Sequence, residues 1–267
     1  MAGMTMRGMG MKESGVVGCR GMPYAQDMEP IEYPIRINRY LALQQYASRR
    51  EADRLIADGQ VRINGTVAVI GDKVHAGDRV TVGSGAKALA KKRVYLAFCK
   101  PEGVVTHSPE RGQKSIADIF DFGERLFPIG RLDKDSRGLI ILTNDGRITD
   151  KLLNPEGEHE KEYLVRVDKP VNPEFIEKMR HGVKLDDGYV TKKCVVESTG
   201  AKQFRITLTE GKKRQIRRMC EALGYAVTDL LRIRIMNVRL RDLRAGEFRQ
   251  LKGAELQTFL GGIGMTR

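Results

Sequence analysis

The strongest constraint on the fold is a continuous apolar run, residues 139–142, that directly follows a charged segment. Four consecutive apolar residues bounded by turn residues are typical of a strand that is buried on both faces. A second strand-like segment, residues 127–129, precedes the charged residues 131–137. Loops held between rigid strands often present functional side chains. The sequence therefore predicts a buried sheet that carries a charged loop between two strands.

Three carboxylates lie in or beside this loop: Asp133, Asp135 and Asp145. A carboxylate can act as a nucleophile or as a general base, but structural ion pairs and turns also use aspartate. Asp145 precedes Gly146 in an Asn-Asp-Gly sequence, so we expect it to be a turn residue. The residues alone leave Asp133 and Asp135 as candidate catalytic groups in the loop.

The composition points to a polyanionic partner. The 267 residues include 47 Lys and Arg against 34 Asp and Glu, which gives a net charge of +13. Basic side chains neutralise phosphates and release counterions, so nucleic acid fits this charge. A membrane surface is the rival polyanion, but no apolar run approaches the ~20 residues of a spanning helix. We therefore expect a nucleic-acid-binding protein that does not contact membranes.

The cysteines and histidines do not form a metal-binding pattern. The four cysteines contain no C-x-x-C pair and the four histidines are scattered, so we expect no metal site. The N-terminus lacks the apolar segment of a signal peptide. We therefore expect reduced thiols and a cytoplasmic protein.

The pattern along the chain predicts two ordered units. We expect, in chain order, a disordered N-terminal extension over residues 1–34, a small α+β unit over 35–82, a linker over 83–92, a larger α+β domain over 93–252 and a C-terminal tail over 253–267. In the small unit, Ser48 and Glu51 have the spacing of a capping box. Asn64-Gly65 lies between alternating residues and predicts a hairpin.

The helix that begins after Ser48 carries Arg50 and Arg54 four residues apart, on one face. Like charges at this spacing disfavour an isolated helix by roughly 0.2–0.5 kcal/mol. Asp53 can pair with Arg49, which leaves the edge formed by Arg50 and Arg54 without a counter-charge. This edge is either an ordinary solvated surface or an RNA-binding surface.

Two segments resemble known families. Gly-Arg-Leu-Asp-Lys-Asp-Ser-Arg-Gly-Leu, residues 130–139, resembles the signature of RNA pseudouridine synthases in the branch that modifies ribosomal RNA. Later segments, among them Lys-Glu-Tyr-Leu-Val-Arg-Val-Asp-Lys-Pro, residues 161–170, and Phe-Arg-Ile-Thr-Leu, residues 204–208, resemble the F type among the synthases for large-subunit rRNA. Residues 35–82 resemble an S4 RNA-binding domain. The resemblance implies an α+β fold, with a small S4 domain followed by a synthase domain whose central sheet is mainly antiparallel. It also implies isomerisation of a specific uridine in 23S rRNA to pseudouridine, without a cofactor.

The resemblance also assigns roles to residues. Asp133 would be the catalytic carboxylate for a flipped-out nucleotide, either as a nucleophile at C1′ or as a base at C2′. Tyr163, in a Lys-x-Tyr motif, would pack against the target base. Arg217, in Arg-Gln-Ile-Arg-Arg-Met, would pair with Asp133. The residues expected to bind RNA are Arg131, Arg214, Arg39, Arg49, Arg50 and Arg54.

The expected partner is 23S rRNA or its precursor, with tRNA left open as a second substrate, and we expect a monomer. The last predicted strand, residues 232–238, alternates basic and apolar residues, which predicts a charged face towards RNA. The alternative function is that of a non-catalytic, ribosome-associated S4 protein. The presence of Asp133, Tyr163 and Arg217 together argues against this alternative.

Overall fold

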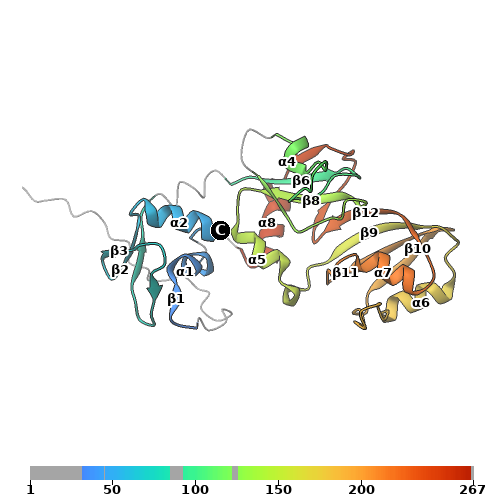
Figure 1. The fold of residues 1–267 in the computed structure, drawn as a ribbon, viewed down its shortest axis with the longest axis horizontal. Helices are drawn as coiled ribbons and strands as arrows, with labels where there is room; N and C mark the ends of the chain where they lie inside the picture. Colours follow the sequence, from blue (N-terminus) through green and yellow to red (C-terminus); the bar gives the residue numbers. More distant parts are fainter. Residues whose placement is uncertain (1–31, 45, 85–92, 122–125, 266–267) are drawn as a thin grey trace, which may run out of the picture.

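The computed structural model describes residues 32–44, 46–84, 93–121 and 126–265 (Figure 1). Most of the expected N-terminal extension and of the expected linker, residues 1–31 and 85–92, lies outside the described residues. The described chain forms a small N-terminal unit and a larger unit built on one extended sheet. Within the described part of the chain, no helix combines the length and apolar character needed to cross a membrane.

Two short helices pack against small sheets in the N-terminal unit. The capping box predicted at the second helix is confirmed: Ser48 Oγ accepts a hydrogen bond from the Glu51 N–H at 3.3 Å, and the Glu51 carboxylate accepts one from the Ser48 N–H at 2.7 Å. Asn64 and Gly65 have φ angles of 51° and 86°, as a tight hairpin turn between two strands requires. The elements are β1 (Ile35–Arg36), α1 (Ile37–Leu43), α2 (Arg49–Ala57), β2 (Val61–Ile63), β3 (Thr66–Val67), β4 (Lys73–Val74) and β5 (Val80–Val82).

A nine-stranded sheet forms the framework of the larger unit. Its hydrogen-bonded order is β10-β11-β9-β12-β8-β6-β14, with β13 paired to β12 and β7 paired to β8. Neighbouring strands are antiparallel except β8 and β12, which confirms the expected mainly antiparallel sheet. The strands are β6 (Tyr95–Lys100), β7 (Phe127–Ile129), β8 (Arg137–Thr143), β9 (Lys161–Val167), β10 (Val195–Gly200), β11 (Gln203–Leu208), β12 (Val227–Ile235), β13 (Val238–Arg239) and β14 (Phe248–Gln250).

Strand β8 is buried on both faces, as its apolar run predicts. Leu139 and Ile141 belong to one core with helices α5 and α8, whereas Ile140 and Leu142 belong to another core with α4. A third core packs α6 and α7 against β9, β10, β11 and β12. The helices are α4 (Ile116–Ile119), α5 (Arg147–Leu153), the 3-10 helix η1 (Pro155–Gly157), α6 (Pro173–His181), α7 (Gln215–Ala222) and α8 (Gly253–Gly262).

The register of the sheet brings polar residues from different strands into one row. The direct cross-strand partners in this row are Val196, Ile206, Tyr163, Arg232, Gly138 and Lys100. Residues that are paired in this way project from the same face of a sheet. Val196 and Ile206, at one end of the row, lie in the core beneath α6 and α7. Tyr163, Arg232 and Lys100 therefore lie on the same face of the sheet as these two helices.

The C-terminal segment differs from the expected tail. Residues 253–262 form α8, and Phe259 is fully buried in the core that α8 shares with β6 and β8. Glu255 accepts two hydrogen bonds from the Arg249 guanidinium, at 2.6 and 2.7 Å. The positions of Leu256, Phe259 and Leu260 at i, i+3 and i+4 are a helical signal that identifies this segment as part of the core.

Asp145, expected to be only a turn residue, is the centre of a buried ionic network. Its side chain is 0% exposed and accepts hydrogen bonds from Tyr95 Oη at 2.6 Å, Arg93 Nη1 at 2.5 Å and Arg147 Nε and Nη2 at 2.8 and 2.7 Å. Burial alone would raise the pKa of Asp145, but the hydrogen bonds and charges of Arg147 and Arg93 hold it below its ordinary value. The carboxylate is therefore ionised in the interior.

The same network reaches the N-terminal unit. Arg93 Nη1 lies 3.7 Å from the Glu51 carboxylate, which belongs to the capping box of α2. A Cβ atom added at Gly146 would lie 2.6 Å from Ser48 Cβ, so only glycine permits this approach. The start of α2 therefore contacts the turn between β8 and α5 (Figure 1).

We predict that Asp145→Asn strongly destabilises the protein. The amide keeps the shape of the side chain but removes the buried negative charge that pairs with both Arg93 and Arg147. Removing one partner of a buried ion pair costs about 3–5 kcal/mol, so the free energy of unfolding in urea should fall by about this amount.

The matched control is Asp150→Asn. The Asp150 side chain is 84% exposed and lies 3.9 Å from Arg49. An exposed ion pair is worth about 0–1 kcal/mol, so this variant should unfold almost as the parent protein does. Equal and small losses for the two variants would contradict a structural role for Asp145.

Candidate active site

The charged loop between β7 and β8 is held by hydrogen bonds from both sides. Thr106 Oγ1 accepts from the Leu132 N–H at 3.0 Å and donates to the Leu132 carbonyl at 2.8 Å. The Gly103 N–H donates to the Lys134 carbonyl at 2.8 Å. The Ser136 N–H donates to the Asp133 carbonyl at 3.1 Å, which closes a turn within the loop. The backbone on either side of Asp133 is therefore fixed.

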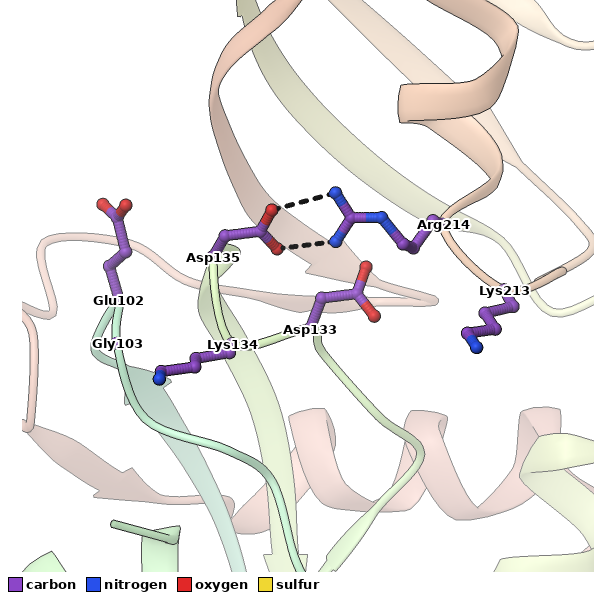
Figure 2. A pocket seen from close by; sticks show the side chains of 7 residues that line it. All are labelled: Glu102, Gly103, Asp133, Lys134, Asp135, Lys213 and Arg214. Carbon is purple, nitrogen blue, oxygen red and sulfur yellow. Dashed lines mark hydrogen bonds and ion pairs between the residues drawn. The ribbon is translucent and has the colours of Figure 1, made fainter. Parts of the chain in front are cut away.

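Asp133 is half-buried and lines two cavities. The larger one has a volume of about 560 Å³ and is lined by Glu102, Gly103, Asp133, Lys134, Asp135, Lys213 and Arg214 (Figure 2). The smaller one, of about 210 Å³, is lined by residues 105–108, Glu110, Gln113 and residues 131–134. Figure 2 shows the Asp133 carboxylate between its own loop and the Lys213–Arg214 segment. The larger volume falls in the range of small-molecule sites.

Asp135, two residues further along, is occupied by arginines. Arg214 donates to both of its carboxylate oxygens, at 3.2 and 3.1 Å, and Arg217 Nε lies 3.3 Å away. Burial acts to raise the pKa of Asp135, but the hydrogen bonds from Arg214 and the charges of Arg217 and Arg214 hold it below its ordinary value. Among the described residues, no cation forms an ion pair with Asp133. Asp133 is therefore the loop carboxylate that is left open to the cavities.

The expected pairing of Arg217 with Asp133 is not present. Arg217 Nη2 donates to the Asp135 backbone carbonyl at 2.6 Å, and Nη1 donates to the Val227 carbonyl at 3.2 Å. The donors of this guanidinium are directed to the second half of the loop and to the start of β12. Arg217 therefore fixes the loop through Asp135 rather than contacting Asp133.

The other expected site residues of the larger unit lie around the loop in different ways. Arg214 is exposed and lines the larger cavity, and Arg131 is exposed and lines the smaller one. Tyr163 is half-buried and lines neither of these cavities. It occupies the sheet row that contains Arg232 and Gly138, next to the point where the loop enters β8.

Two buried cations near the loop escaped the sequence analysis. Lys100 is 0% exposed, and its Nζ donates to the carbonyls of Pro101 and Val104 at 2.8 and 2.7 Å. Burial lowers the pKa of Lys100 to about 8, although the negative charges of Asp133 and Asp135 oppose this change. Arg232 and Arg234, on the strand expected to face RNA, do not present free charges to it: Arg232 is only 3% exposed, and Arg234 pairs with Glu160 and Glu162. A lysine that ends an apolar strand immediately before Pro-Glu-Gly is the signal that could have identified Lys100.

The arginines of the N-terminal unit lie on its surface. Arg39, Arg49, Arg50 and Arg54 are all exposed. The expected pair between Arg49 and Asp53 is not present, because Asp53 accepts a hydrogen bond from Asn38 at 2.8 Å and Arg49 lies 3.9 Å from Asp150. In the described chain, Arg50 and Arg54 form no ion pair, so α2 presents two uncompensated charges to the solvent.

Comparison with known families agrees with this arrangement. Residues 94–222 match the RNA pseudouridylate synthase family, and residues 35–80 match the S4 domain. The chain belongs to the RNA pseudouridine synthase family. It therefore carries an RNA-modifying enzyme domain preceded by an S4 RNA-binding domain, which confirms the expected fold class, enzyme class and RNA substrate.

Individual relatives cover most of the chain. It is 50% identical to the dual-specificity RNA pseudouridine synthase RluF of Salmonella typhi, over 83% of this chain and 77% of the relative. It is 36% identical to ribosomal large subunit pseudouridine synthase B of Bacillus subtilis, over 83% and 94%. A crystal structure of a pseudouridylate synthase superposes with a TM-score of 0.61 at 27% identity, over 86% of this chain and 99% of that chain. These similarities do not favour a non-catalytic RNA-binding protein.

We predict that the carboxyl group of Asp135 titrates below its ordinary pKa of 3.8 and that Arg214→Gln raises this pKa. A carboxyl group whose pKa is lower in the folded state stabilises the fold above the ordinary pKa, and this contribution disappears as the pH falls through the lowered value. NMR titration of the carboxyl carbon would measure the change. An unchanged midpoint in Arg214→Gln would show that this arginine does not set the charge of Asp135.

Proposed function

We propose that this protein isomerises a specific uridine of 23S rRNA, or of its precursor, to pseudouridine with Asp133 as the catalytic carboxylate. The observation that carries the proposal is the contrast between the two loop acids. Asp133 lines both cavities without an ion pair in the described chain, whereas Asp135 is bound by Arg214 and Arg217. The rRNA target is supported by the relative named as a large-subunit synthase.

We include tRNA as a second substrate in the proposal, because the relatives from Salmonella typhi and Escherichia coli are named as dual-specificity enzymes. One chain carries both an RNA-binding unit and the loop with Asp133, so a second copy is not required, and we propose a monomer. We propose that it acts in the cytoplasm, where its rRNA substrate is found.

The reaction conserves atoms and electrons. The C1′–N1 bond breaks, the base turns, a C1′–C5 bond forms, the proton on C5 is lost and N1 gains a proton. Asp133 can attack C1′ and form a covalent intermediate, or it can remove the C2′ proton as a base. Either role requires a carboxylate whose oxygens face the substrate, and the presence of Asp133 on the wall of both cavities supports such a role.

The surrounding residues would handle the nucleotide. A base must leave the helical stack to reach Asp133, at a cost of a few kcal/mol. We propose that Tyr163 packs against this base and that Arg131, on the adjoining cavity, holds the flipped nucleotide. Arg214 is 44% exposed beyond its pair with Asp135 and can also contact a phosphate. Arg217 would act indirectly, by fixing Asp135.

The first prediction compares two isosteric changes in the loop. Asp133→Asn should abolish tritium release from C5-labelled uridine RNA, because an amide is neither a nucleophile nor a base at neutral pH. Its RNA affinity should stay close to that of the parent protein. Asp135→Asn should retain measurable turnover, since Asp135 acts through its arginine contacts. If Asp133→Asn shows multiple turnover equal to or greater than that of Asp135→Asn, the proposal that Asp133 carries the chemistry is wrong.

The second prediction concerns the division of labour between residues 35–82 and 93–265. Replacing Arg50 and Arg54 with Gln should weaken RNA binding similarly for different sequences. The slope of log K against log salt should decrease by about 1–2, because two phosphate contacts would be lost. The single-turnover rate at saturating RNA should barely change, because the catalytic carboxylate lies in the other unit.

A matched control removes two charges that are already neutralised. Lys178 and Lys192 are half-exposed, and each pairs with a glutamate, Glu174 at 2.7 Å and Glu158 at 2.9 Å. Replacing both lysines with Gln changes the net charge by the same amount. If this control reduces the salt slope as much as the α2 variant does, net charge rather than the Arg50–Arg54 edge controls RNA binding.

A further inference from the structure

Arg232 is a buried arginine on β12 at the centre of the sheet. Its neighbours in the row are Tyr163 on β9 and Gly138 on β8. It is 3% exposed and pairs with no carboxylate among the described residues, which is rare for an arginine. The proposed chemistry at Asp133 does not use this side chain. Its location, directly beside the exit of the Asp133 loop, therefore requires a physical explanation.

The guanidinium of Arg232 bonds to the backbone at both ends of the loop. Nε donates to the Leu139 carbonyl at 2.6 Å, and Nη1 donates to the Arg131 carbonyl at 3.3 Å. Arg131 lies two residues before Asp133, and Leu139 lies just after the loop, inside β8. A single rigid side chain thus fixes the distance between the entry and the exit of the loop.

The backbone of Arg232 is also pressed against β8. A Cβ atom added at Gly138 would lie 2.4 Å from the Arg232 carbonyl oxygen and 2.9 Å from its nitrogen, and Gly138 has a φ of +104°. Only glycine allows this approach and this conformation. The glycine therefore sets how closely the arginine can approach the loop.

The positive charge of Arg232 affects the pKa of two lysines. Burial is the main cause that lowers the pKa of Lys100 and of Lys161, and the positive charge of Arg232 lowers both further. The charges of Asp133 and Asp135 act on Lys100 in the opposite direction. The sheet row next to the loop thus contains two buried cations, Lys100 and Arg232. In the described chain Arg232 Nη2 is buried without a hydrogen-bond partner, so burial of this arginine is not explained by complete hydrogen bonding.

We propose that Arg232 is a positioning residue for Asp133. It holds the Arg131 and Leu139 carbonyls so that the carboxylate faces the cavities, and it places a buried positive charge beneath the loop. Arg217 holds the second half of the loop through Asp135, so the two arginines fix the loop from different strands and helices. This inference rests on the proposed catalytic role of Asp133.

The test uses Arg232→Met and Arg232→Lys in the full chain. In Arg232→Met the single-turnover rate at saturating RNA should fall about 100-fold, the scale expected for a misplacement of about 1 Å, with RNA affinity within about threefold of the parent protein. Hydrogen exchange should become faster in residues 130–139 but not in α6 or α7. Arg232→Lys keeps the charge and one hydrogen bond, so it should recover about tenfold of the lost rate and stay about tenfold below the parent protein.

The matched control is Arg234→Met, two residues further on the same strand. The Arg234 side chain is 15% exposed and pairs with Glu160 and Glu162, away from the loop. This variant should keep the parent rate and the parent exchange in residues 130–139. Equal losses of rate in the two methionine variants, with faster exchange throughout the domain, would reduce Arg232 to a general stabilising residue.

Two further outcomes overturn the proposal. Unchanged exchange in residues 130–139 of Arg232→Met would show that Arg232 does not hold the loop. If Arg232→Met does not fold, Arg232→Lys provides the test. A lysine variant with the parent rate and the parent exchange would show that the two hydrogen bonds of Arg232 to Leu139 and Arg131 are not needed. Failure of the proposed function would be seen separately, because the parent protein would then release no tritium from C5-labelled rRNA. Hydrogen exchange does not depend on turnover, so it still tests whether Arg232 holds the loop.

Discussion

The synthase domain depends on one short junction between two halves of its sheet. Strands β8 and β12 are the parallel neighbours that join β10-β11-β9-β12 to β8-β6-β14, and their register consists of the pairs Leu231–Arg137 and Arg232–Gly138. Arg137 reinforces the junction with two hydrogen bonds to Asp229, at 2.8 and 2.7 Å. The Asp133 loop enters β8 at this point. The position of the candidate catalytic carboxylate is thus determined by how closely two backbones pack at Gly138.

The loop shows how environment separates two acids that are chemically identical. Asp135 faces Arg214 and Arg217, which hold it ionised and fix the loop from α7. Asp133 lines the cavities, and the two buried cations of the sheet row, Lys100 and Arg232, bond to backbone carbonyls instead. Lys100, Arg217 and Arg232 therefore bond to the backbone around the site, and the Asp133 carboxylate itself stays available to a substrate.

The features that the sequence predicted correctly depend on neighbours along the chain. The apolar run of β8, the capping box at Ser48 and the Asn64-Gly65 hairpin each follow from residues within a few positions. Two of the errors concern partners that are distant in sequence. Asp145 is buried because Tyr95, 50 residues earlier, and Arg93 reach it. Arg217 contacts Asp135, 82 residues earlier in the chain, rather than Asp133, because the loop and α7 come together only in the folded protein. Periodicity and turn chemistry carry no information on which of two nearby carboxylates an arginine will contact.

Helix α8 has a consequence for how this protein is made. Phe259 packs in a core that includes residues of β6, β8 and α5, which lie more than 100 residues earlier in the chain. During synthesis domains generally fold from the N-terminus as they emerge, and the S4 unit has all its core residues by Val82. The core that α8 shares with β6 and β8 has no such early completion, because it lacks Phe259 until α8 has left the ribosome. An RNA-binding unit is thus finished and exposed beside ribosomal RNA while the catalytic unit of the same chain is still incomplete.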